Sequence, residues 1–181
     1  LWQLFAGQVN PGEEEADDYV LKKDIRASIG REVAAARRTV PFSQVRSLRN
    51  VDIKCKSYKA VDWMYFLLCT GEVLLAGRLP DAYFNMFMEL CSAARLLLRP
   101  GGISASDLNA SEYHLQQFQV AFYREVYRGD AARLPDCRST VAAIMDVIPN
   151  IKSCGPVWVS WQFPMERHVG TLARLITSRS N

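Results

Sequence analysis

The segment "RLPDAYFNMFMELCSAARLLLRPGG", residues 78–102, decides the fold class of this 181-residue chain. Pro80 suits the first turn of a helix, and the run Pro100-Gly101-Gly102 ends a helix abruptly. Between these points the apolar side chains recur at helical spacing. They are Tyr83, Phe87, Leu90, Ala94 and Leu97, flanked by Phe84, Met88 and Cys91. A stripe this wide predicts a helix buried between other helices.

The same criteria predict helices on both sides of this segment. Ser104 or Ser106 can cap the next helix, Pro41 closes the first one, and Gly71 is expected to break the second. Another kink or end is expected near Pro149. In chain order, the expected helices cover residues 21–40, 58–69, 80–99, 104–127, 140–151 and 164–176.

One short strand is expected near the C-terminus, from Val157 to Trp161, because this run is β-branched and aromatic. A lone strand leaves its backbone groups without partners, so it must pair with a further strand or with part of a longer protein. The expected architecture is therefore mainly α, with about six helices and one short strand.

The chain divides into an acidic, loosely structured lead-in over residues 1–20 and a single helical domain over residues 21–181. Within the domain, a basic helix and connection are expected at 21–59 and a helical core at 60–152. A strand followed by a helix is expected at 155–177. We find no internal repeat and no low-complexity tract.

Composition excludes several classes of protein. No apolar run is long enough to cross a bilayer, and no secretory signal pattern is present. The five cysteines are scattered and never form a C-x-x-C pair, so neither a zinc knuckle nor a disulfide framework is expected. This pattern indicates a reducing, intracellular location. The first residue is Leu1 rather than methionine, which suggests a processed chain or a piece of a longer one.

Positive charge is concentrated in one segment, although the net charge is only +3. Half of the 22 lysines and arginines lie between residues 22 and 59, against three acids, Asp24, Glu32 and Asp52. Such a stretch can neutralise phosphates, and a solvated helix face followed by a charged loop is the alternative. The candidate DNA-binding residues are Lys22, Lys23, Arg26, Arg31, Arg37, Arg38, Arg46, Arg49, Lys54, Lys56 and Lys59.

Side chains with catalytic chemistry are few. No P-loop, G-x-G-x-x-G or G-x-S-x-G motif occurs, and neither His114 nor His168 has a cysteine near it in sequence. Cys137 precedes a helix but has no neighbouring base, so we do not take it as a nucleophile. Glu166 follows Pro164 in the first turn of the last helix, where a carboxylate stabilises free backbone N–H groups.

A resemblance gives Glu166 a second interpretation. The stretch "GPVWVSWQFPMERHVGTL", residues 155–172, resembles a signature near the end of CACTA-type (En/Spm-like) DNA transposases, of the kind abundant in mushroom-forming fungi. The motif residues are Trp158, Trp161, Pro164, Arg167 and Gly170. The likeness extends upstream in register through "LWQLFAGQV" (1–9), "IGREVAAARRTVP" (29–41), "DWMYFLLCTGEVLLAGRLPDAYFNMFMELCSAARLLL" (62–98) and "FYREVYRGDAARLPDC" (122–137).

The resemblance implies a cut-and-paste transposase, a nuclease and strand transferase acting on terminal inverted repeats in the nucleus. It implies Mg²⁺ or Mn²⁺ held by three carboxylates, a possible homo-oligomer, and a fragment of an RNase H-like core with a helical insertion. Only the C-terminal part is matched, after the two catalytic aspartates of the family, so Glu166 corresponds to the third carboxylate. We expect no metal bound to this chain alone.

The chain also departs from that pattern. Two family histidines fall at Ala142 and Asp146, and the family Cys-Pro is Cys137-Arg138 here. Decay of an inactive copy or reuse of the helical domain would explain both changes. The alternative function is a non-enzymatic, transposase-derived helical module that binds DNA or a protein partner, with Glu166 only capping its helix.

Overall fold

The computed structural model describes residues 1–7, 18–36, 49–99, 101–137, 139–159, 168–169 and 171–172. Over these ranges the chain is mainly helical, as the sequence predicts, and contains no strand. No helix in the described ranges is both long and apolar enough to cross a membrane.

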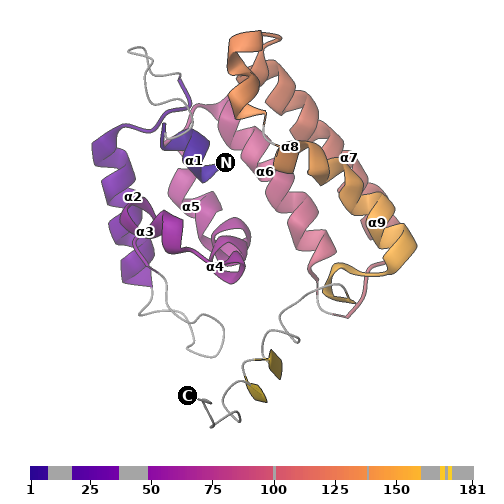
Figure 1. The fold of residues 1–181 in the computed structure, drawn as a ribbon. Helices are drawn as coiled ribbons and strands as arrows, with labels where there is room; N and C mark the ends of the chain where they lie inside the picture. The colour runs from indigo at the N-terminus through magenta and orange to yellow at the C-terminus, as the bar shows by residue number, and fades with distance from the viewer. Residues whose placement is uncertain are drawn as a thin grey trace, which may run out of the picture.

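The frame of the molecule is the antiparallel pair α6 (Asp81–Leu97) and α7 (Ala105–Phe122), seen on the right of Figure 1. Both helices match the predicted segments. Both helices contribute buried side chains to the core, among them Met86 and Phe87 from α6, and Leu115 and Phe118 from α7. A π-helical turn, Tyr123–Tyr127, extends α7, and a 3-10 helix, Ala131–Asp136, follows it.

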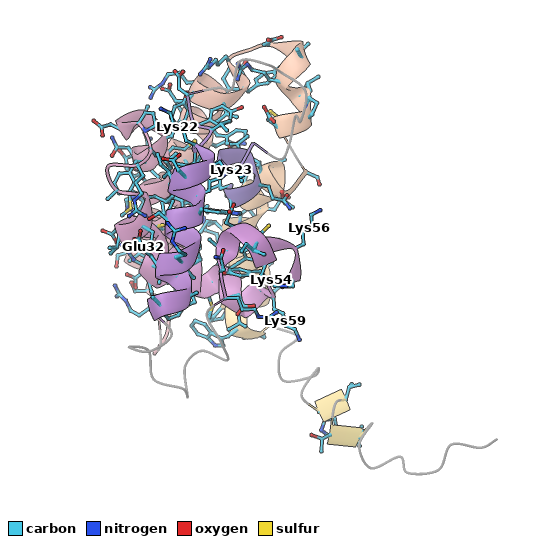
Figure 2. The ribbon with its side chains drawn as sticks, turned by 90° about the vertical axis from the view of Figure 1, so that its left-hand side faces the viewer. Lys22, Lys23, Glu32, Lys54, Lys56 and Lys59 are labelled. Carbon is cyan, nitrogen blue, oxygen red and sulfur yellow. The ribbon has the colours of Figure 1, made fainter. Side chains whose placement is uncertain are left out.

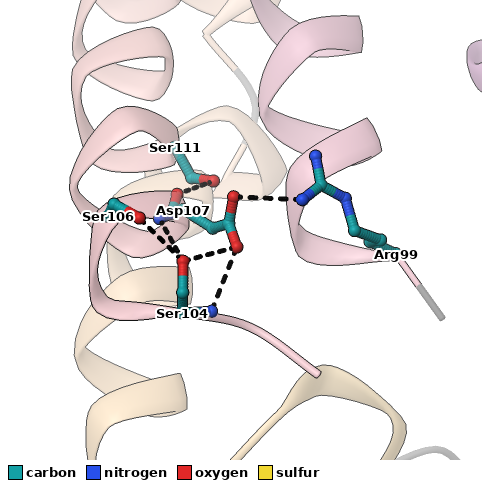
Figure 3. Close-up of polar contacts among 5 residues, drawn as sticks. All are labelled: Arg99, Ser104, Ser106, Asp107 and Ser111. Atoms are coloured by element: carbon teal, nitrogen blue, oxygen red, sulfur yellow. Dashed lines mark hydrogen bonds and ion pairs between the residues drawn. The ribbon is translucent and has the colours of Figure 1, made fainter. Parts of the chain in front are cut away.

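The N-terminus of α7 is closed by a reciprocal cap (Figure 3). The Asp107 backbone N–H donates to Ser104 Oγ at 3.1 Å, while the Ser104 hydroxyl and N–H donate to Asp107 Oδ2 at 2.6 and 3.1 Å. Arg99, at the end of α6, pairs with the same carboxylate at 3.4 Å. The hydrogen bonds from Ser104 lower the pKa of Asp107. Of the two serines expected as caps, Ser104 is therefore the one that acts as N-cap.

The segment before α6 continues through the glycine that we expected to break it. Helix α4 (Ala60–Tyr65) runs into a π-helical turn, Phe66–Thr70, and then into α5 (Gly71–Leu75). A Cβ atom at Gly71 would lie 2.7 Å from the Phe66 carbonyl oxygen and 2.7 Å from Phe87 Cζ. The prediction of a break was wrong. Gly71 lets this segment approach α6 closely because it has no side chain, and local sequence does not reveal that contact.

On the left of Figure 1 lie α1 (Trp2–Phe5), α2 (Lys23–Ala36) and α3 (Val51–Lys54). Helix α3 continues into a 3-10 helix, Cys55–Ser57. Trp2, Phe5 and Tyr19 are buried in the main core, so the described parts of residues 1–20 are packed and not loosely structured. The aromatic content of this segment explains its burial, since each such side chain removes a large apolar area from water.

The last described helices lie along α7 (Figure 1). They are α8 (Ser139–Ala142), a 3-10 helix (Ala143–Asp146) and α9 (Val147–Cys154), where the sequence predicts one helix over 140–151. Pro149 lies in the first turn of α9, where no backbone N–H is required, so it does not end the helix. Ile148 and Ile151 bury against Leu115 of α7.

The predicted strand is wrong for the residues that the structure describes. Val157–Val159 form a 3-10 turn, whereas residues 160 and 161 lie outside the described ranges. β-branched residues favour a strand only where a partner strand is present, and these ranges contain none. The predicted RNase H-like fragment is therefore not confirmed. The last predicted helix is helical at 168–169 and 171–172, and its remainder lies outside the described residues.

The cap of α7 yields a stability prediction. Ser104→Ala removes the N-cap acceptor and should lower the free energy of unfolding by about 1 kcal/mol, as measured by urea denaturation. Gln116→Ala, an exposed change farther along α7, is the control and should stay within about 0.5 kcal/mol of the unmodified chain. Equal losses in the two variants would contradict the assignment of Ser104 as the cap.

Candidate nucleic-acid interface

The basic segment lies on two neighbouring elements. Figure 2 shows the labelled lysines in two places: Lys22 and Lys23 at the N-terminal end of α2, and Lys54, Lys56 and Lys59 along α3 and the turn that follows it. Arg31, on α2, and Arg49, just before α3, are also exposed. The remaining predicted cations, Arg37, Arg38 and Arg46, lie outside the described residues.

Arg26 is the exception among the predicted DNA contacts. Its guanidinium donates to the Ala6 carbonyl oxygen, and its Nε lies 3.9 Å from Asp52 Oδ1. Only 21% of each of these two side chains is exposed. Arg26 therefore ties α2 to α1 and α3 and offers less exposed charge than the neighbouring lysines. Its contact with DNA stays a prediction.

The acids of the segment are mostly neutralised within the protein. Asp52 faces Arg26, and Glu32 accepts two hydrogen bonds from Arg78 Nη2, at 2.8 and 2.9 Å. The hydrogen bonds from Arg78 and, second, from Ser28 lower the pKa of Glu32. Asp24, in the first turn of α2, is the acid that stays exposed, where it favours the helix dipole.

The lysine-bearing turn, residues 49–59, is closed by its own hydrogen bonds. Arg49 Nη1 donates to Ser57 Oγ at 3.2 Å, and Ser57 Oγ donates to the Lys54 carbonyl oxygen at 2.9 Å. The Tyr58 hydroxyl donates to the Arg49 carbonyl oxygen. Burial, chiefly, raises the pKa of Tyr58. These bonds fix the backbone that carries Lys54, Lys56 and Lys59.

Two residues that the sequence analysis missed position this turn against α2. Asn50 caps α3, its Oδ1 accepting from the backbone N–H groups of Asp52 and Ile53 at 3.0 and 3.1 Å. Gly30 lies directly under that cap, since a Cβ atom there would be well under 3.0 Å from the Asn50 side chain. A glycine within an otherwise regular helical pattern was the signal in the sequence that could have indicated such a contact.

Cations on the α6–α9 side of the molecule are different, because they are paired. The ion pairs there are Arg95–Glu72, Arg99–Asp107, Arg124–Glu125 and Lys152–Glu112. In contrast, no salt bridge within the described part of the chain involves Lys22, Lys23, Arg31, Lys54, Lys56 or Lys59. In the described ranges, exposed cations without a salt bridge therefore gather on α2 and the turn 49–59.

The residues suggested by the transposase resemblance are only partly described. Glu166, Trp161, Pro164, Arg167 and Gly170 lie outside the described residues, whereas Trp158 is half-buried in the 3-10 turn. Ala142 and Asp146, at the positions of the family histidines, are both exposed.

No metal centre is assembled by the residues that the structure describes, since no three His, Cys, Asp or Glu side chains there lie close enough to hold an ion. Glu166, the ligand that the resemblance implies for this chain, lies outside those residues, so we derive no chemical step through a metal.

Cys91, Cys137 and His114 have environments that favour a structural role. Burial raises the pKa of Cys91 to about 12, and its Sγ donates to the Leu67 carbonyl oxygen. Burial, and secondarily Asp136, raises the pKa of Cys137, which argues against a nucleophilic thiolate there. His114 Nδ1 lies 2.7 Å from Glu89 Oε2 and joins α7 to α6.

The Glu32–Arg78 pair predicts a pH dependence. The pKa of Glu32 is lower in the folded chain than in the unfolded one. The contribution of the ionised carboxylate to folding stability is therefore complete above the unfolded pKa of about 4.3. It is lost as the pH falls through the lower, folded pKa. On acidification below about pH 4.5, the free energy of unfolding should therefore fall less in Glu32→Gln than in the unmodified chain. The difference should be at most about 1 kcal/mol, because the pair is partly exposed to solvent. Identical urea midpoints against pH in the two chains would contradict this.

Comparison with known proteins does not identify a family for this chain. No protein-family model, no curated protein and no solved structure matches the chain. The likeness to CACTA transposases thus rests on the quoted motifs, and the candidate interface rests on the charges and contacts described above.

Proposed function

We propose that this chain is the helical C-terminal part of a CACTA-like DNA transposase, and that α2 and the turn 49–59 bind DNA through its phosphates. The observation that carries the DNA-binding role is the gathering of unpaired, exposed cations on α2 and the turn 49–59. The motif resemblance supports the transposase origin and with it a nuclear location and a homo-oligomer.

The pairing contrast favours a binding surface over an ordinary solvated face. On the α6–α9 side, exposed arginines and lysines have acidic partners, as is common on protein surfaces. On the α2 side, Glu32 and Asp52 are each held by an arginine, so they do not offset the lysines. A cluster of uncompensated cations raises the local potential and attracts polyanions such as DNA.

A catalytic role for Glu166 is proposed only within a longer protein. There it would join two upstream aspartates, and Mg²⁺ or Mn²⁺ would supply activation of the attacking oxygen and stabilisation of the leaving one. The support for this role is the match of residues 155–172 to the family signature. The described residues contribute no further ligand.

A second candidate function is a non-enzymatic helical module that binds DNA or a protein. Ala142 and Asp146 in place of the family histidines favour it. So does the outer face of α7 and the π-helical turn that extends it, where Tyr113, Val120 and Tyr123 are 58%, 58% and 59% exposed. Exposed apolar side chains on one helix face are a feature of protein-docking surfaces.

Substitution of the lysine turn tests the DNA-binding role. Lys54→Gln/Lys56→Gln/Lys59→Gln should weaken binding to a duplex oligonucleotide, measured by fluorescence anisotropy over a range of salt concentrations. The slope of log K against log[salt] should become shallower by about 0.9 for each phosphate that the turn no longer neutralises.

A matched control removes three cations elsewhere, Arg99→Gln/Arg124→Gln/Lys152→Gln, and changes the net charge by the same amount. Its salt slope should equal that of the unmodified chain. No binding by the unmodified chain, or equal weakening in the two triple variants, would contradict a DNA site on α2 and the turn 49–59.

The nuclease role has a separate test in the longer protein. Glu166→Gln should abolish Mg²⁺-dependent nicking of DNA carrying terminal inverted repeats, because one of three metal-binding carboxylates is removed. Glu112→Gln, a surface carboxylate on α7, is the control and should nick normally. Undiminished nicking by Glu166→Gln would remove Glu166 from the mechanism and leave it as a helix cap.

A further inference from the structure

We propose that Gly30 and Asn50 are positioning residues of the DNA surface, because their contact holds the lysine turn at a fixed place relative to the lysines of α2. This inference rests on the proposed DNA-binding function. It assigns a role to two uncharged residues that touch no nucleic acid and instead set the geometry of residues that do.

The two groups of lysines lie on different elements, so the protein frame decides how they stand relative to each other. Lys22 and Lys23 lie at the start of α2, whereas Lys54, Lys56 and Lys59 follow Asn50 on α3 and the turn after it. Gly30 lies about 10 Å beyond Lys23 along the axis of α2. The point at which the turn rests on α2 therefore sets the place of its lysines relative to Lys22 and Lys23.

The hydrogen bonds within the lysine turn fix its own shape but not its place relative to α2. Helix α3 is four residues long, too short to be stable alone, and only Val51 and Cys55 of the turn are buried in the core. The Asn50 cap satisfies two backbone N–H groups at the start of α3 and rests on α2 at Gly30. The Arg26–Asp52 pair lies on the same junction.

Gly30 is the residue that permits this contact, since any side chain there would meet the Asn50 side chain. A Cβ atom would force Asn50 to rotate away and give up its cap, at a cost of about 1 kcal/mol. The gain in helix propensity from glycine to alanine within α2 is about 1 kcal/mol in the opposite direction. Gly30→Ala should therefore leave overall stability nearly unchanged while it releases the start of α3.

Two groups held on one frame bind a polyanion as a bivalent unit, and the fixed spacing raises the effective concentration of the second group once the first is bound. When the frame is loosened, the charges remain but this advantage disappears. A change in affinity at constant net charge is thus the signature of positioning, and a merely structural role predicts affinity and stability falling together.

The experiment compares Gly30→Ala with the unmodified chain for duplex affinity, salt slope and urea stability. We expect the unfolding midpoint to be retained and the salt slope to become shallower, toward that of the Lys54/Lys56/Lys59 triple variant. The double variant Gly30→Ala/Asn50→Ser should restore the slope, because serine is smaller and still caps a helix. Ala35→Gly, an exposed change in α2, is the control and should leave the slope unchanged.

An unchanged slope in Gly30→Ala, with the triple variant weakened, would overturn the inference and leave the DNA-binding role intact. Absence of salt-dependent binding by the unmodified chain would instead contradict the proposed function itself. If Gly30→Ala does not fold, Asn50→Ala takes its place, since it removes the cap without adding volume; a slope equal to that of the unmodified chain would then overturn the inference.

Discussion

The close approach of α2 to the start of α3 is the contact on which the basic face of this molecule depends. It is possible because position 30 has no side chain, and it brings the Asn50 cap onto the surface of α2. Arg26 reinforces the junction by reaching both Asp52 and the Ala6 carbonyl oxygen. The consequence is electrostatic: Asp52 and Glu32 are held in ion pairs with arginines, and the lysines of this face are exposed to solvent.

The rest of the fold packs against the elements that form this junction. The α6–α7 pair forms the frame, and the N-terminal segment ties it to the basic half through Leu21 N–H donating to the Phe5 carbonyl oxygen at 2.7 Å. Tyr19 packs edge-on against Tyr83 of α6, whose hydroxyl accepts from Arg128 at 2.8 Å. Arg128 holds a left-handed backbone conformation at the end of the π-helical turn, with φ of 56°. Segments distant in sequence are thereby joined into one packed body.

The sequence predicts the helical frame because its signals are local. Helical spacing together with Pro80 and Ser104 marks α6 and α7 without any knowledge of their neighbours. Gly71 was misread for the opposite reason, since its role depends on Phe66 and Phe87, which only the folded chain brings together. The strand expected at Val157 failed on the same ground: strand formation requires a partner, and propensity alone does not supply one.

In the candidate site, too, local features could be predicted from the sequence and tertiary contacts could not. Exposed lysines could be predicted from charge density, whereas the internal role of Arg26 could not, because its partners are 20 and 26 residues away in sequence. The positioning role of Gly30 was likewise invisible, because it depends on the approach of Asn50. What the residue pattern suggested about Glu166 concerns a part of the chain outside the described residues, and it stays a proposal.

Residue-resolved NMR during titration with a duplex oligonucleotide tests the central claim most directly. The account predicts signal changes at Lys22 and Lys23 together with Lys54, Lys56 and Lys59, with one shared saturation point. Signals of Arg99, Arg124 and Lys152 on the α6–α9 side should stay in place. Changes centred on that paired side, or different saturation points for the two lysine groups, would contradict a single DNA surface built on the α2–α3 junction.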